Sequence, residues 1–560
     1  MEKMHTTKEV STADDIDLQV GEAMDTLGPQ VTTTSDRHGE YKRTISARQV
    51  HVISLGSNIG SGVLIATGKG LSNAGPLGAL LAYGMVATAV TAVYQVLGEM
   101  TIAFPTSGNF IDYADRFVHP SIAFAAGFAE WLGWSAVLGS EAVFFSLIVQ
   151  QWTNVVPEAV WLTLFILATA ALFSLPTKWF AWYEYVTSVV KVFGVMIFLI
   201  MDFAIIVGAG PKGKVHHGET WHEGPLVKNG FGGFSSASLL ALWAMADQVF
   251  ITIMGGETTS PRLAISRAAK TVPVRIATIY LLTVIFASIL VSSDDPRLFG
   301  GSSTSQSPFT IAMEEAGIHG VDEFLRVIIL LSVFGFGAEA IYVASRILRA
   351  LSYQGLIPQL IAAKVDSRGR PVWSLIITGV VSIALTYINL SGNEVVLTYN
   401  FVGTGTTIFI WLSSITASAF FIVWIVVAVT SLRFHAALKK QNDMLFTEVL
   451  AWRCWWWPVP AIWLLAVSTL LFICCLYSGL YPLGADVISA ENFFQYNIGV
   501  VIVIVFTIAH KLIYRSRFRQ PATADLTTGR RTLRGEEISM LQQYYDRPAW
   551  VRAMAYFKFW

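Results

Sequence analysis

The chain has 560 residues, of which 54% are hydrophobic and only 14% are charged, and its mean hydropathy is +0.56. Because a soluble domain carries about 25% charged residues, this composition excludes a soluble globular protein and indicates an integral membrane protein. The net charge of zero gives no indication of nucleic-acid binding, and the cysteines lack the spacing of a disulfide framework or a metal site: Cys454, Cys474 and Cys475.

Polar segments flank a long apolar body. Residues 1–47 are rich in Thr, Asp, Glu and Ser and contain no apolar h-region. We therefore predict a disordered cytosolic tail there rather than a cleaved signal. Residues 516–560 form a second polar segment, which is predicted to be a cytosolic C-terminal tail.

The body between the tails is predicted to be all-α and to span the membrane. A membrane helix needs about 20 apolar residues, and stretches of that kind recur from residue 49 to residue 513. Twelve transmembrane helices are predicted: 49–68, 76–98, 121–150, 159–176, 184–208, 233–256, 275–293, 324–345, 372–392, 400–431, 459–482 and 496–513.

The first predicted span contains the stretch GSNIGSG at 56–62, although glycine costs about 1 kcal/mol in a helix interior. One explanation is packing, because Gly56 and Gly60 form a G-x-x-x-G pair that lets two helices approach closely. The other is a broken helix whose free N–H groups bind an anionic group near the membrane midplane. The stretch also supplies small polar side chains that packing does not require, which favours the binding loop: Ser57, Asn58 and Ser61.

Ionisable side chains inside the spans are functional candidates because charge in a bilayer is costly. Glu99 ends the second span and Glu257 ends the sixth, so both are predicted to have structural or gating roles near the cytosol. On the third span, Glu130 and Glu141 are eleven residues apart and share a helix face. Both could be paired with neighbours inside the bundle.

The fifth span contains Lys191 and Asp202, which also share a face but lie about 16 Å apart along the helix, too far to pair directly. A buried lysine can lose and regain a proton, which makes Lys191 a candidate for coupling transport to protons. The alternative is that Lys191 is the permanent partner of a buried carboxylate.

Basic residues predict the orientation of the chain, because cytosolic loops are enriched in Lys and Arg. The loop after the sixth span carries Arg262, Arg267, Lys270 and Arg275, and the segments after the eighth and twelfth spans are also basic. The loop between the seventh and eighth spans is acidic and is expected to be external. Both termini are then cytosolic.

Four long stretches, in this order along the chain, resemble the fungal amino-acid permeases of the amino acid–polyamine–organocation superfamily: GSNIGSGVLIATGKGLSNAGPLGALLAY, LGEMTIAFPTSGNFIDYADRFVHP, GGETTSPRLAISRAAKTVPVRI and ASRILRALSYQGLIPQLIAAKVDSRGRP. The resemblance covers about 48–515. It implies a LeuT-type fold with two inverted repeats of five spans, at about 48–208 and 233–431, and two extra spans at about 459–513. The first and sixth spans would be broken at a central site.

The resemblance also implies proton-coupled uptake of a small-molecule amino acid across the plasma membrane, with no cofactor and with the proton gradient as the driving force. The family's first-span pattern, G-G-x-I-G-T-G, would bind the substrate carboxylate through its backbone and stands here as Gly56, Ser57, Asn58, Ile59, Gly60, Ser61 and Gly62. Lys191 and Glu141 match a lysine and a glutamate of the family, which implies proton coupling; in related folds such a lysine resembles an ammonium that replaces bound sodium.

The sixth span departs from the family pattern, which resembles G-T-E where this chain has Asp247, Gln248 and Val249. In the eighth span, Glu339 stands where the family often has serine. Compared with the family pattern, this chain therefore lacks one carboxylate, at Val249, and has two additional ones, Asp247 and Glu339. Asp247 and Gln248 are expected to line the substrate site, and Glu339 is a second carboxylate candidate. For Asp247, recognition of a substrate amine, proton binding and a structural role all remain open.

Other functions are weighed against a permease. A membrane enzyme is disfavoured because the H-E-x-x-H, G-x-S-x-G and P-loop motifs are absent from the sequence. An amino-acid sensor that transports weakly or not at all, an exchanger and a polyamine-type carrier remain alternatives. The bilayer is the one predicted partner besides the substrate, and the residues specify no oligomeric state.

Overall fold

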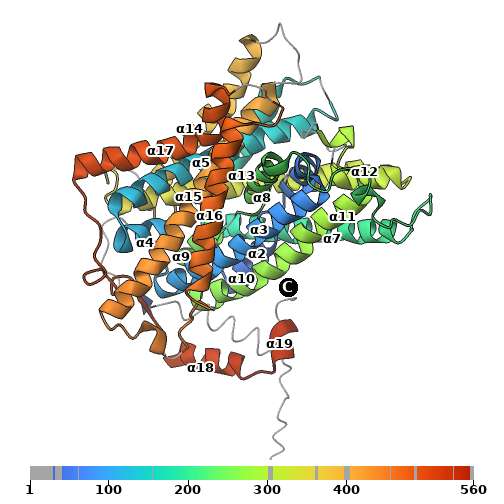
Figure 1. The fold of residues 1–560 in the computed structure, drawn as a ribbon. Helices are drawn as coiled ribbons and strands as arrows, with labels where there is room; N and C mark the ends of the chain where they lie inside the picture. The colour runs from blue at the N-terminus through green and yellow to red at the C-terminus, as the bar shows by residue number, and fades with distance from the viewer. Residues whose placement is uncertain are drawn as a thin grey trace, which may run out of the picture.

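The computed structural model describes residues 30–31, 41–60, 62–153, 155–246, 248–299, 307–359, 363–395, 404–448, 450–454, 456–484, 488–533 and 535–554. Helices dominate these residues (Figure 1). Among them, nine helical segments are long and apolar enough to cross a membrane: Thr67–Ala103, Pro120–Val149, Thr177–Ile206, Gly230–Glu257, Pro261–Leu290, Glu323–Tyr353, Ser414–Lys440, Val459–Leu480 and Ala490–Tyr514.

The prediction of an all-α membrane protein is confirmed by these segments. Two further apolar helices are shorter, α6 (Glu158–Ser174) and α14 (Val372–Val395). The first predicted span is divided between α2 (Ala47–Gly56) and the π-helical turn η1 (Gly62–Ala66). The count of twelve spans stays a prediction.

Two apolar segments are interrupted in the middle. The helix α2 begins at a capping box, in which Ser46 and Gln49 bond reciprocally, and it ends at Gly56. The chain resumes helical geometry at η1 and continues into α3 (Thr67–Ala103), which is kinked at Gly75, where φ is +74°. Similarly, α8 (Gly230–Met245) stops before α9 (Gln248–Glu257) begins.

The helix α5 (Pro120–Val149) lies inside the bundle and packs along α13 (Val321–Tyr353) and α15 (Thr404–Lys440). The helix α3 packs along α8, and α2 packs on α7 (Thr177–Ile206) and on α10 (Pro261–Arg275). After α10 the chain passes through the π-helical turn η3 (Ile276–Leu281) into α11 (Leu282–Leu290). These contacts hold both interrupted segments within the bundle.

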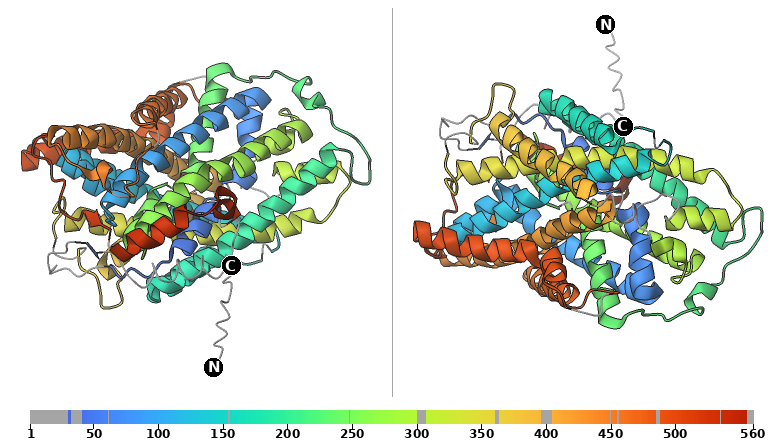
Figure 2. Two further views of the ribbon diagram at one scale, coloured as in Figure 1. Left: turned by 90° about the horizontal axis from the view of Figure 1, so that it is seen from below. Right: turned by 90° about the horizontal axis from the view of Figure 1, so that it is seen from above.

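The remaining elements lie mostly at the rim of the bundle. They are α4 (Asn109–Phe117), α12 (Pro308–Glu315), α16 (Val459–Leu480), α17 (Ala490–Tyr514), α18 (Gly535–Tyr545) and α19 (Ala549–Met554), with the 3-10 turns η2 (Glu219–Trp221), η4 (Pro296–Phe299) and η6 (Leu445–Thr447). Figure 2 shows α18 lying against the bundle beside α10.

The two terminal segments meet in a short antiparallel ladder. The strand β1 (Gln30–Val31) pairs with β2 (Arg531–Thr532), so that Gln30 faces Thr532. The predicted N-terminal tail lies mostly outside the described residues. The C-terminal segment folds into β2, α18 and α19 and contacts the helix bundle.

Candidate functional site

The glycines at the break in the first span have different surroundings. A Cβ atom on Gly56 would lie 2.6 Å from the Cα atom of Ser188, so α2 crosses α7 in direct backbone contact. A Cβ atom on Gly62 would lie 2.8 Å from the Cα atom of Ala244. At Gly60, in contrast, the nearest atom of the described residues is 4.0 Å away. Packing therefore explains Gly56 and Gly62, whereas the G-x-x-x-G pairing does not explain Gly60.

Asn58 links the two interrupted segments. Its Nδ2 atom donates a hydrogen bond of 2.8 Å to the carbonyl of Ala244, near the end of α8. Its own carbonyl accepts a hydrogen bond of 3.0 Å from the hydroxyl of Tyr280 in η3. The side chain of Asn58 is therefore engaged by protein, and its contribution to the site is to position the backbone of 56–62.

Gln248 has a corresponding role at the sixth-span break. Its Nε2 atom donates to the carbonyl of Met245 at 2.9 Å, and its Oε1 atom accepts from the indole of Trp424 on α15 at 3.1 Å. Gln248 is buried, and it therefore ties the break to α15. Two of the predicted binding residues, Ser61 and Asp247, lie outside the described residues.

Lys191 reaches the first-span break from α7. Its Nζ atom lies 3.3 Å from the carbonyl of Ser57 and 3.2 Å from Oε1 of Glu184, and both charged side chains are fully buried. A Cβ atom on Gly335 of α13 would lie 2.9 Å from this Nζ atom, so α13 closes the site from the other side. The ammonium thus joins a buried carboxylate to the unwound backbone.

The carboxylates of α5 and α13 occupy the bundle interior. Glu130, Glu141 and Glu339 are each 0% exposed. Oε1 of Glu130 accepts a hydrogen bond of 2.9 Å from the indole of Trp134. The ring of Trp134 packs against Phe336 of α13 and Phe420 of α15, with centroids 5.9 and 5.5 Å away. Asp202 is also buried, farther along α7.

Glu257 closes the end of α9 through a buried ion pair. Its Oε1 atom lies 2.9 Å from Nε of Arg346 on α13, and its backbone carbonyl accepts a hydrogen bond from Ile45. The guanidinium of Arg346 lies 3.9 Å from the ring centroid of Tyr342 and 5.5 Å from that of Tyr41. Burial raises the pKa of Tyr41, which precedes the first span, so its hydroxyl stays neutral.

Glu99, the other predicted gating residue, contacts a different part of the molecule. Oε2 of Glu99 lies 3.0 Å from Nε2 of His435 on α15, and Oε1 accepts from the backbone N–H of Cys454 at 3.1 Å. The ring of His435 stacks on Trp457, with centroids 3.9 Å apart. These contacts join α3 to α15 and to the segment that precedes α16.

Several residues at this site were not predicted from the sequence to belong to it. The most important are Glu184, the partner of Lys191, and Arg346, the partner of Glu257. Arg275 and Tyr280 also contact the first-span segment, because Nη1 of Arg275 donates to the carbonyl of Ser54 at 2.6 Å. The spacing of seven residues between Glu184 and Lys191 places them two turns apart on one face of α7.

Comparisons with known proteins extend over most of the chain. A family model described as amino acid permease matches residues 49–522. An amino-acid permease GAP3 from Candida albicans is 31% identical over 86% of this chain and 78% of its own length. The general amino-acid permease GAP1 of Saccharomyces cerevisiae is 30% identical over 90% of this chain and 82% of its own.

The architecture also has a counterpart among solved structures. A manganese transporter from Eremococcus coleocola superposes with a TM-score of 0.52, covering 87% of this chain and 98% of that one. The two sequences are 12% identical. The similarity is therefore one of fold.

Proposed function

Because the chain belongs to the amino acid permease family, we propose that it is a proton-coupled permease, which takes up an amino acid or a related amine-bearing compound across the plasma membrane. It is a transporter rather than an enzyme. The observation that carries the proposal of proton coupling is the contact of the buried Lys191 ammonium with both Glu184 and the Ser57 carbonyl.

The proposed coupling follows from this contact. The protonated lysine attracts the Ser57 carbonyl and thereby stabilises one conformation of the first-span break. A neutral amine would attract it less, so loss of the proton favours movement of α2. Transport is coupled if the site takes its proton from outside and releases it to the cytosol. Glu141, buried on α5, is a second candidate for carrying that proton.

Substrate is proposed to bind at the backbone of 56–62. Among the residues that the structure describes, Gly60 has space for a ligand next to it, and unwound backbone inside a membrane protein supplies N–H groups for a carboxylate. Asp247 and Glu339 are the proposed partners of the amine end. An anionic carboxylate at either position would favour a substrate that carries an amine.

We further propose twelve spans with two inverted repeats and both termini in the cytosol. The pairing of β1 with β2 supports the same side for both termini, because the two tail segments touch. The basic residues that follow the sixth span, which lie on α10, support the cytosolic assignment of that side.

The test is uptake of a panel of labelled amino acids by cells that lack their own permeases, at several external pH values. We expect concentrative uptake that falls as external pH rises. Lys191→Met should remove the pH dependence or stop uptake, whereas Lys178→Met, at an exposed position of the same helix, should behave like the wild type.

Two results would overturn the proposal. Specific binding of an amino acid without uptake would indicate a sensor. Uptake by Lys191→Met that stays concentrative and pH-dependent would remove this lysine from coupling. Equal amounts of each variant at the cell surface are required for the comparison.

A further inference from the structure

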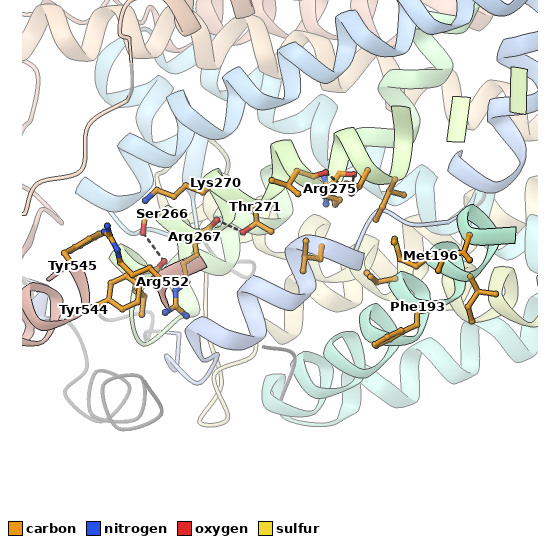
Figure 3. A pocket seen from close by; sticks show the side chains of 18 residues that line it. Phe193, Met196, Ser266, Arg267, Lys270, Thr271, Arg275, Tyr544, Tyr545 and Arg552 are labelled. Carbon is orange, nitrogen blue, oxygen red and sulfur yellow. Dashed lines mark hydrogen bonds between the residues drawn. The ribbon is translucent and has the colours of Figure 1, made fainter. Parts of the chain in front are cut away.

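A groove of about 820 Å³ lies on the side of the bundle and reaches Leu55, next to the first-span break (Figure 3). Its walls come from α7 and from α10 with η3, its floor includes Leu55 of α2, and α18 and α19 border one end. The groove therefore lies between the membrane-spanning helices and the C-terminal segment of the protein.

The two ends of the groove differ in chemistry. Toward one end it is lined by apolar residues that are half exposed, among them Phe193 (50%), Ile200 (63%) and Val274 (55%). In a multi-pass membrane protein such a surface faces lipid. The other end holds the cations Arg267 and Lys270 of α10, as Figure 3 shows.

Arg552 of α19 adds a third positive charge to this end. Among the described residues, no carboxylate lies within 4.0 Å of the charged groups of Arg267, Lys270 or Arg552. The Nε atom of Arg552 is buried and has no hydrogen-bond partner within the described part of the chain. A guanidinium with an unused buried donor is suited to a phosphate oxygen.

Two tyrosines frame the cationic end. The guanidinium of Arg267 lies 5.2 Å from the ring centroid of Tyr544, and that of Arg552 lies 5.9 Å from that of Tyr545. These contacts orient the two arginines but neutralise no charge. The cationic end of the groove therefore carries positive charge that these aromatic contacts do not compensate.

We propose that this groove binds an anionic phospholipid of the cytosolic leaflet. Its phosphate group lies among Arg267, Lys270 and Arg552, and an acyl chain follows the apolar surface of α7 and η3. The cytosolic leaflet is rich in anionic lipids, and a basic site near its surface attracts them. The inference rests on the proposed orientation of the chain but not on its proposed substrate or coupling.

The position of the groove gives the lipid a contact with the transport machinery. Leu55 precedes Gly56, the last residue of α2, and Arg275, which also lines the groove, donates to the carbonyl of Ser54. A bound acyl chain therefore touches the helix that ends at the first-span break. Lipid occupancy is expected to stabilise α2 in the conformation described here.

The test measures lipid retention by the purified full-length protein, using native mass spectrometry after exchange into detergent with phosphatidylserine or phosphatidylcholine. We expect the wild type to retain phosphatidylserine in preference. Because each basic residue contributes about 1 kcal/mol to binding an anionic lipid, the Arg267→Gln/Lys270→Gln protein should bind it roughly 30-fold more weakly. The matched control removes two charges from another basic loop, in Lys364→Gln/Arg368→Gln, and should leave retention unchanged.

A second variant tests the apolar end without changing any charge. Val274→Trp places a large side chain into the groove from an exposed position, so it should reduce phosphatidylserine retention while the unfolding temperature in detergent stays the same. The proposal is overturned if the wild type retains phosphatidylserine and phosphatidylcholine equally. It is also overturned if the control variant loses as much phosphatidylserine retention as the Arg267→Gln/Lys270→Gln protein, or if Val274→Trp retains phosphatidylserine fully. Equal competition by inorganic phosphate or by glycerophosphoserine would show an anion site with no role for the acyl chain, which also overturns it. None of these readouts depends on transport.

Discussion

Gly60 is the residue of the first-span break that packing leaves unexplained. Its neighbours Gly56 and Gly62 have backbone within 2.6 and 2.8 Å of an added Cβ atom, whereas around Gly60 no atom of the described residues lies closer than 4.0 Å. A methyl group at residue 60 can therefore be accommodated by the protein alone. If the open space belongs to the substrate, the same methyl group takes up room that the ligand needs.

Gly60→Ala is accordingly expected to reach the membrane at the wild-type level and to lose most of its uptake. Gly84→Ala is the matched control, because Gly84 lies in the interior of α3 and a Cβ atom there meets no atom of the described residues within 4 Å. It should keep uptake and gain up to about 1 kcal/mol of helix stability. Gly56→Ala, which clashes with α7, should instead lower the amount of folded protein. Full uptake by Gly60→Ala would argue against a binding loop.

Lys191 and Glu184 are best tested as a pair. Removing one member of a buried ion pair typically costs about 3–5 kcal/mol, because the other charge is left uncompensated, whereas replacing both by apolar residues is often neutral. We expect Lys191→Met and Glu184→Leu each to lower the unfolding temperature and the double variant to recover it. If Lys191 couples transport to protons, the recovered double variant still lacks pH-dependent uptake. Recovery of both stability and coupling would leave the pair with a structural role alone.

At the scale of elements, the ion pair of Glu257 with Arg346 joins α9 to α13 and to the chain that enters α2. Arg346→Gln keeps most of the side-chain volume but removes the charge that compensates Glu257. We expect this variant to open this end of the bundle, which is cytosolic in the proposed orientation. A thiol reagent could then reach a cysteine placed at the fully buried Ile45. The measurement is maleimide labelling of Ile45→Cys, in a background without the native cysteines, with and without Arg346→Gln. Arg368→Gln serves as control, and unchanged labelling in Arg346→Gln would exclude a gate here.

Helix boundaries explain which parts of the site the sequence predicts. Apolar length identifies the spans, and the clustered glycines identify the break at 56–62. Hydropathy, however, starts the fifth span at Glu184 and ends the eighth before Arg346. The helix α7 begins at Thr177 and α13 extends to Tyr353, so both residues lie within helices and are buried. Their partners compensate their charge, and a hydropathy scale evaluates each residue without its partner.

Other features depend on contacts that no local pattern encodes. The π-helical turn η3 brings Tyr280 to the carbonyl of Asn58, and the two residues are 222 positions apart. Gln248 is predicted to line the substrate site, yet its two polar ends are bonded to Met245 and Trp424. Gln248 lies at the sixth-span break, where α9 begins, but its partners follow from the packing of α15 and its role toward substrate stays a prediction.

At the scale of the whole molecule, the C-terminal segment is held against loops from distant parts of the chain. Arg530 lies 2.8 Å from Asp443 and 2.5 Å from Glu448, and the carbonyl of Thr528 accepts a hydrogen bond from Arg116. Arg530 and Asp443 are each 16% exposed and Glu448 is 43% exposed, so solvent and salt reach these pairs. The tail is therefore docked by several weak contacts, which can release it without disturbing the helix bundle.

Arg530→Gln is expected to make the tail more accessible to trypsin while uptake remains. Cleavage would be followed with a C-terminal tag on inside-out vesicles, which expose the cytosolic side in the proposed orientation. Raising the ionic strength should accelerate cleavage of the wild type and reduce the difference in cleavage rate between the wild type and Arg530→Gln. Equal cleavage of both proteins at low salt would show that Arg530 does not hold the tail.

The contact of Gly56 with Ser188 has a mechanical consequence. Because the backbones of α2 and α7 are in contact at this point, α2 cannot move along α7 without separating from it. Its permitted movement is therefore a rotation about Gly56. The ten residues of α2 form a lever about 15 Å long. A rotation of roughly 20° would then displace its far end by about 5 Å. In the proposed orientation and coupling, a small change of position at the buried ammonium would thus be amplified into an opening at the cytosolic surface.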